Sequence, residues 1–143
     1  MRKHEAKEKV EPARPASGRE KAAWCVRAVL EHKALDVVLL DVAGLTSFTD
    51  FFLIFSGTSS RQVQGIVDKV EDILAGLGLK PLGIEGRREG HWVLMDYGDV
   101  VIHAFYEPVR VFYDLESLWS DAKRLTVAAG VDDLTGDAQE GTL

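Results

Sequence analysis

Apolar residues occur along this chain in two patterns, helical spacing and short continuous runs, and together these predict an α/β domain. Ser17 followed by Glu20 matches a helix-capping box, and the apolar spacing after it predicts a helix over residues 18–33. The continuous runs at 36–42 and 50–56 predict strands that are buried on both faces. The connector between them has the residues of a loop and leaves the relative direction of the two strands open.

The most regular helical pattern begins at a second capping box, Ser59 to Gln62. Its apolar face consists of Val63, Ile66, Val67, Val70, Leu74 and Leu77. Gly76 and Gly78 end the pattern, because glycine readily adopts the left-handed conformation at a helix C-terminus. A short strand is expected near residues 80–85.

A hairpin and a last helix complete the predicted domain. Strands over 91–95 and 100–105 are joined by Asp96-Tyr97-Gly98-Asp99, whose aspartates and glycine suit a tight turn. Asp114 then caps a helix in which apolar residues recur as far as Leu125. The predicted order is α-β-β-α-β-β-β-α, with a five-stranded mixed sheet flanked by helices.

The composition fits one globular domain with polar ends. The chain has 143 residues, of which 46% are hydrophobic, and this is long enough to bury a sizeable core over residues 18–129. Residues 1–17 are polar and slightly basic, whereas residues 130–143 are acidic and rich in Gly, Asp and Thr. Both terminal segments are predicted to be disordered arms.

Charge and cysteine content restrict the partners. The formal charge of −6 opposes binding to phosphate backbones, so a basic protein is the expected partner and sequence-specific nucleic-acid binding is not. Cys25 is the only cysteine, which excludes an internal disulfide and a multi-thiolate zinc site. No apolar run approaches the roughly 18 residues that span a bilayer. These features predict a cytoplasmic protein.

The sequence contains little that indicates an enzyme. Residues 57–61, GTSSR, precede a helix, where backbone N–H groups favour anions, but they lack a Walker loop and helix capping alone explains them. A nucleotidyltransferase needs two metal-binding carboxylates alternating along the next strand, and only Glu85 is available there. His103 lies in an apolar run and is predicted to be a buried histidine with local hydrogen bonds. We therefore predict no catalytic residue, metal or cofactor.

The aromatic and charged residues around the hairpin are better candidates for binding. Trp92 follows a polar loop at the start of a strand, where a large ring can anchor an interface as readily as it can fill a core. Asp96 and Asp99 either stabilise the turn or face a basic partner. Arg110 is expected chiefly to bond backbone carbonyls or to pair with an acid from the hairpin.

Four ordered motifs give the chain a close resemblance to the ribosomal silencing factor family, also called the Iojap family. They are Thr49-Asp50 leading into SGTSSRQV, the Glu85-Gly86 pair, HWVLMDYGDVVIH, and the segment from Arg110 to Trp119. The resemblance spans roughly residues 21–125 and excludes the two arms.

The resemblance implies a nucleotidyltransferase-like fold and a non-enzymatic protein that binds the large ribosomal subunit. It implies contact with ribosomal protein number fourteen of that subunit, steric exclusion of the small subunit, and reduced translation when nutrients are scarce. A homodimer that competes with ribosome binding is also implied. Five residues match the family motifs in position and are therefore candidates for partner binding that are expected to be exposed: Glu85, Trp92, Asp96, Tyr97 and Asp99.

Two other functions remain open from the residues. A factor that assists assembly of the large subunit requires the same surface as a silencing factor. A nucleotide-binding or nucleotidyl-transferring enzyme is suggested by the GTSS turn and opposed by the missing carboxylate pair.

Overall fold

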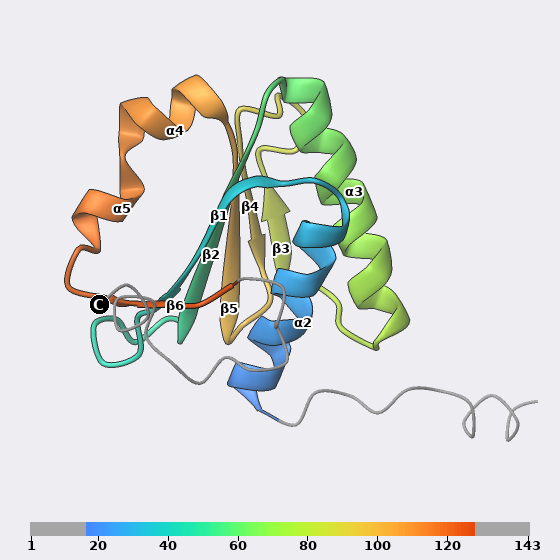
Figure 1. The fold of residues 1–143 in the computed structure, drawn as a ribbon. Helices are drawn as coiled ribbons and strands as arrows, with labels where there is room; N and C mark the ends of the chain where they lie inside the picture. The colour runs from blue at the N-terminus through green and yellow to red at the C-terminus, as the bar shows by residue number, and fades with distance from the viewer. Residues whose placement is uncertain (1–16, 128–143) are drawn as a thin grey trace, which may run out of the picture.

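The structure, a computed structural model, describes residues 17–127 and contains one mixed sheet between two helical layers. The sheet order is β3-β4-β5-β2-β1-β6, in which only β2 and β5 are parallel. Helices α2 and α3 cover one face, and α4 and α5 lie on the other (Figure 1). The elements are α2 (Gly18–Glu31), β1 (Leu35–Asp41), β2 (Phe51–Gly57), α3 (Ser60–Gly76), β3 (Gly83–Glu85), β4 (Trp92–Asp96), β5 (Val100–Tyr106), α4 (Glu107–Tyr113), α5 (Leu115–Leu118) and β6 (Lys123–Leu125).

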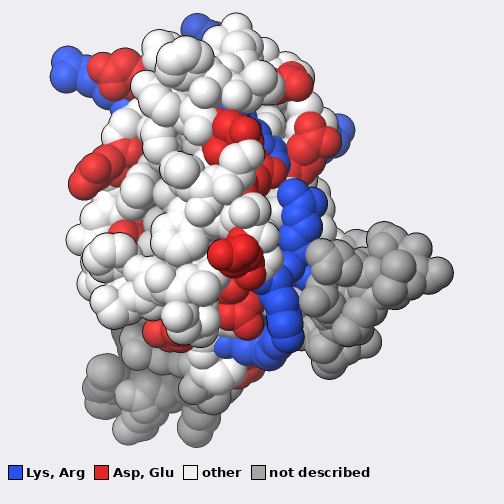
Figure 2. All heavy atoms as spheres, turned by 90° about the vertical axis from the view of Figure 1, so that its left-hand side faces the viewer, with Lys and Arg blue, Asp and Glu red and all other residues white. Residues whose placement is uncertain are grey.

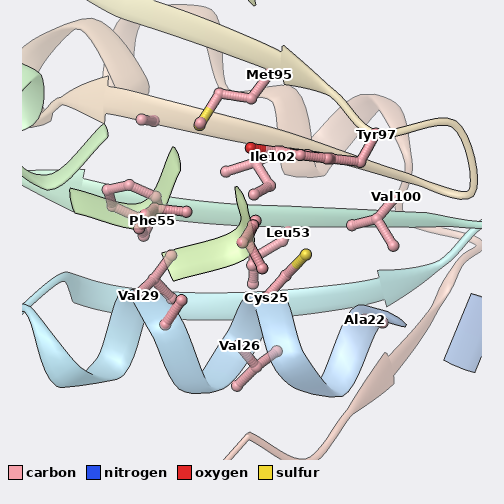
Figure 3. Close-up of a cluster of buried hydrophobic side chains, with 14 of the residues drawn as sticks. Ala22, Cys25, Val26, Val29, Leu53, Phe55, Met95, Tyr97, Val100 and Ile102 are labelled. Atoms are coloured by element: carbon pink, nitrogen blue, oxygen red, sulfur yellow. The ribbon is translucent and has the colours of Figure 1, made fainter. Parts of the chain in front are cut away.

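Strand β2 divides the hydrophobic core into two layers, because alternate side chains of a strand point to opposite faces. Leu53 and Phe55 face α2 and α3, where they pack with apolar residues such as Cys25 (Figure 3). Phe52 and Ile54 belong to the layer under α4 and α5. Every residue of β2 is buried, which confirms the strand predicted from its continuous apolar run.

The predicted helix caps are present at both long helices. Ser17 Oγ accepts from the Glu20 N–H at 3.1 Å, and Ser59 Oγ accepts from the Gln62 N–H at 3.0 Å. The Gln62 amide oxygen also accepts from the Thr58 N–H at 2.6 Å. Two backbone donors at the start of α3, those of Thr58 and Gln62, are therefore already bonded within the chain, as expected for a capped helix.

The C-terminal part of the domain differs from the prediction of a long helix after Asp114. Helix α4 starts earlier, at Glu107, and Asp114 ends it in a left-handed conformation with φ 47°. Helix α5 has only four residues, and β6 then pairs antiparallel with β1 as a sixth strand. The reason is that Leu115 packs in the outer core layer and Leu125 in the layer under α2 and α3. A single helix cannot place these residues on opposite faces of the sheet.

The predicted terminal arms, residues 1–17 and 130–143, lie outside the described residues except for Ser17. Within the described part of the chain, no helix is long and apolar enough to cross a membrane.

A buried arginine fixes α4 to the sheet. Arg110 is 8% exposed, and its Nη1 donates to the Asp36 carbonyl and to Ser56 Oγ, each at 2.8 Å. Its Nε and Nη2 donate to the two carboxylate oxygens of Glu116 at 3.2 and 2.8 Å. The prediction of carbonyl bonding and an acidic partner is confirmed, although the acid comes from α5 instead of the hairpin. One guanidinium thus joins β1, β2, α4 and α5.

Replacing this guanidinium is expected to destabilise the domain. Arg110→Met should lower the free energy of unfolding by about 3 kcal/mol, because Glu116 then loses its principal partner in a largely buried site. Urea unfolding followed by circular dichroism measures the loss. Arg87→Met is the matched control, since Arg87 pairs with Asp68 and Glu71 while its side chain stays 39% exposed. That change should cost less than about 1 kcal/mol. Equal losses in the two variants would contradict the assigned role of Arg110.

Candidate functional site

The site lies on β3 and β4, on the face of the sheet that carries α4 and α5, which is called the outer face below. These two helices leave this part of the outer face partly uncovered. Glu85 pairs with Leu94 across these strands, so the two side chains share a face. Strand alternation places Trp92 and Asp96 on that face too, and the burial pattern of β4 agrees with it. Trp92 and Asp96 lie at opposite ends of β4, about 13 Å apart along the strand. The structure therefore brings three of the five predicted residues to one surface.

The other two predicted residues lie on the side of α2. Tyr97 is 3% exposed and points into the core layer between the sheet and the helices (Figure 3), so the expectation that it is exposed is wrong. Burial raises the pKa of its hydroxyl, which stays protonated. Asp99 is half-exposed and pairs with Lys21 Nζ at 3.5 Å. Lys21 also donates to the Tyr97 carbonyl at 2.9 Å, so both residues help to attach the turn to α2.

Asp96 has a structural bond as well as a surface position. Its Oδ1 accepts from the Gly98 N–H at 2.9 Å, which is the turn-stabilising role that the sequence suggested. The second oxygen has no hydrogen bond among the described residues. Asp96 can thus stabilise the turn and still present negative charge on the outer face.

The indole of Trp92 is held in one orientation by its neighbours. Its Nε1 donates to Nδ1 of His103 at 3.1 Å. The ring also lies against Phe105, with centroids 4.9 Å apart, and against Tyr113, with centroids 5.0 Å apart. Trp92 remains only half-buried, so a pre-oriented aromatic surface is available to a partner without further ordering cost.

His103 supplies the hydrogen-bond acceptor for that indole. The imidazole is 5% exposed and meets Phe52 edge to face at 4.9 Å. Burial lowers the pKa of His103 to about 4, so the ring is neutral near pH 7. Because Nδ1 accepts from Trp92, the proton of the neutral ring lies on Nε2. The predicted buried histidine with a local hydrogen bond is confirmed.

The loop that leads into β4 is fixed by Gly86 and by α3. Gly86 has φ 84°, and a Cβ there would lie 2.1 Å from the Trp92 carbonyl oxygen, so only glycine fits. Gln64 of α3 donates to the carbonyls of Arg87 and Arg88 at 3.0 and 2.8 Å. These contacts set the backbone position from which the Trp92 side chain projects.

Two shallow hollows share Trp92 as a wall. One, of about 330 Å³, is lined by Glu85, Gly86, Trp92 and Leu94. The other, of about 290 Å³, is lined by Gly86, Glu89, His91, Trp92, Val109 and Tyr113. Each hollow combines a carboxylate with an aromatic face, an arrangement that suits the aliphatic stem and cationic head of Lys or Arg.

Sequence reasoning missed three contributors to this site: Glu89, Tyr113 and the acceptor role of His103. Glu89 lies four residues after Glu85 in the polar loop, so its charge was visible but its position beside Trp92 was not. The contacts of Tyr113 and His103 with Trp92 depend on the strand register and on the path of α4. Residues 17–127 contain no cluster of three or more His, Cys, Asp or Glu side chains that could hold a metal ion.

The environment of His103 predicts a pH dependence of stability. The unfolded chain binds a proton near pH 6.5, whereas the native imidazole takes one up only near pH 4, so stability falls as pH drops through this window. His103→Gln retains a side-chain oxygen that can accept from Trp92 but does not titrate. Between pH 7 and 5 the wild type should lose about 2 kcal/mol more unfolding free energy than this variant, as measured by urea unfolding. Parallel losses in the two proteins would refute the assignment.

The sequence of this chain is similar to those of known proteins. A family model described as "Ribosomal silencing factor during starvation" matches residues 15–142. The chain is 41% identical over 106 residues to the ribosomal silencing factor RsfS of Halalkalibacterium halodurans, a match covering 74% of this chain and 91% of the relative. It is 31% identical over 98 residues to a mouse protein named mitochondrial assembly of ribosomal large subunit protein 1, covering 66% of this chain and 43% of that relative.

A solved structure agrees with these sequence matches. The crystal structure of a protein from Chromobacterium violaceum superposes with a TM-score of 0.71 at 34% sequence identity, covering 80% of this chain and 95% of that one. Sequence and fold give the same assignment. The chain therefore belongs to the ribosomal silencing factor family.

Proposed function

We propose that this protein represses translation by binding the large ribosomal subunit through its ribosomal protein number fourteen and sterically blocking the small subunit. The observation that carries the proposal is the half-buried indole of Trp92 between two hollows that each contain a carboxylate. Repression under nutrient limitation, a cytoplasmic location and a homodimer that competes with the ribosome belong to the same proposal.

The chemistry of the site supports a basic protein partner. Glu85 and Glu89 place negative charge on either side of an indole that is already oriented by His103. The formal charge of the whole chain is −6, which favours encounter with a basic surface and opposes binding to exposed RNA. Ribosomal proteins that contact rRNA carry such basic surfaces.

Blocking by occlusion requires no chemistry at the site. The family to which the chain belongs is one of non-enzymatic ribosome-binding factors, and this agrees with the predicted absence of catalysis. At the start of α3, where a nucleotide phosphate would be expected in an enzyme of this architecture, the side chains of Ser59 and Gln62 accept from two of the backbone donors. A rigid body seated between the subunits is sufficient for repression.

Assistance in assembly of the large subunit is the second candidate function. It is supported by the name of the mouse relative, mitochondrial assembly of ribosomal large subunit protein 1. The same Trp92 surface would serve both roles. Binding to immature subunits in preference to mature ones would favour assembly over silencing.

Removing the indole should weaken binding without unfolding the domain. Trp92→Ala is expected to reduce affinity for purified large subunits at least about 30-fold, the effect of a central aromatic hot spot. Cosedimentation over a range of protein concentrations measures it. Trp24→Ala is the matched control, because Trp24 lies on α2 on the opposite side of the sheet, and circular dichroism checks the fold of both variants. Unchanged affinity for the Trp92 variant would remove this residue from the interface.

Subunit joining tests the steric mechanism itself. Saturating wild-type protein should reduce the formation of complete ribosomes from purified subunits, as seen in sucrose gradients, and Trp92→Ala should restore joining at the same concentration. Normal joining at saturating wild-type protein, or comigration with the small subunit alone, would overturn the proposed function.

A further inference from the structure

Helices α4 and α5 expose an apolar ridge that core packing does not explain. Val111, Phe112, Tyr113 and Leu118 are 72%, 78%, 52% and 76% exposed. Figure 2 views the side of the molecule that carries these helices and shows a largely uncharged surface with several acidic side chains on it, and a band of Lys and Arg side chains along one edge. Exposed apolar residues grouped in this way are typical of a protein interface.

The ridge separates two hollows. On the β4 side, Val109 and Tyr113, four residues apart along α4, line the hollow next to Trp92. On the β1 side lies a larger hollow of about 640 Å³, and Glu107, Val111 and Asp114 contribute to its wall. Residues at these spacings lie on one side of a helix, so α4 presents different residues to each hollow. Phe112 belongs to neither lining and is the most exposed residue of the ridge.

The hollow on the β1 side carries excess negative charge. Its lining includes Asp36, Glu107, Asp114 and Glu116, against Arg110 and Arg124. Arg110 pairs with Glu116 at 2.8 Å, and Arg124 lies 3.7 Å from the same carboxylate. The described contacts therefore leave Asp36, Glu107 and Asp114 without a cationic partner. Both sides of the ridge are thus flanked by carboxylates.

We infer that the partner's footprint extends beyond Trp92 across the whole ridge, and that the partner surface has an apolar depression flanked by Lys or Arg side chains. This inference rests on the proposed function and enlarges its interface. Phe112 and Val111 enter the depression, Glu85 and Glu89 meet cations on one side, and Glu107 and Asp114 meet cations on the other. Trp92 and Tyr113, whose rings are in contact, connect the two parts of the footprint.

Charge complementarity favours a basic protein as the partner of this ridge. A second copy of the chain also has a formal charge of −6. If the ridges of two copies were in contact, carboxylates of one copy would lie opposite carboxylates of the other. Nucleic acid and anionic lipid surfaces are repelled by the same flanks. A basic protein satisfies the apolar centre and the acidic flanks together.

The apolar part of the inference is tested with a matched pair of phenylalanine variants. Phe112→Ser should weaken cosedimentation with purified large subunits about tenfold or more, since truncation of a buried interface aromatic has effects of this size. Phe48→Ser is the control, because Phe48 is 81% exposed and lies in the β1–β2 loop, at the opposite end of β2 from α4. It should bind as the wild type does.

The acidic part is tested through the salt dependence of binding. Glu107→Gln combined with Asp114→Asn removes two charges; asparagine tolerates the left-handed conformation at position 114 and keeps an acceptor for Ser117. The double variant should bind more weakly and lose affinity less steeply as salt increases. Asp72→Asn, an exposed carboxylate on α3, is the control and should leave both quantities unchanged.

The outcomes separate this inference from the proposed function. If Trp92→Ala weakens binding while Phe112→Ser and the double variant bind as the wild type does, the footprint ends at Trp92 and the inference fails alone. If the wild type does not bind large subunits, the proposed function fails and the footprint with it. If Phe112→Ser changes only self-association in analytical ultracentrifugation, a second copy covers the ridge and the inference is overturned.

Discussion

The burial of β2 along its whole length is the constraint on which the rest of the structure depends. A strand with large apolar side chains on both faces is stable only between two covering layers and between two neighbouring strands. Strands β1 and β5 supply the neighbours, the first antiparallel and the second parallel. The parallel pairing forces a long connection from β2 to β5, and that connection contains α3, β3 and β4. Strands β3 and β4, which carry Glu85 and Trp92, lie within this crossover.

The two covering layers are built differently, and the difference leaves the candidate surface exposed. Helices α2 and α3 are long and bury apolar stripes, so the inner face of the sheet is closed. The outer layer consists of two short helices that Arg110 ties to the sheet through polar contacts. Because α4 and α5 are too short to cover every strand, part of β3 and β4 stays open to a partner. The exposed ridge on α4 extends the same incomplete layer.

The site illustrates how one polar contact in a mostly apolar layer can determine orientation. His103 lies among Phe52 and Phe105, yet its Nδ1 accepts from the Trp92 indole. Burial keeps the imidazole neutral and therefore able to accept. A purely apolar neighbour would allow the indole to adopt several orientations. His103, predicted to be a buried core residue, thus orients Trp92, a candidate for partner binding.

Local patterns determined much of this protein in advance. The capped helices, the buried strands, the hairpin turn and the separate family motifs were all visible in the sequence, because each depends on residues that lie close together along the chain. The tertiary structure alone decided which side each residue faces. Tyr97 and Trp92 lie five positions apart, yet Tyr97 is buried in the core layer under α2 and α3, whereas Trp92 packs against the layer under α4 and α5. Leu125 likewise fits a helical pattern, but it belongs to the sixth strand, β6, because residues 123–125 pair with β1. Such outcomes depend on strand register and on contacts between distant segments, and local spacing does not encode either of them.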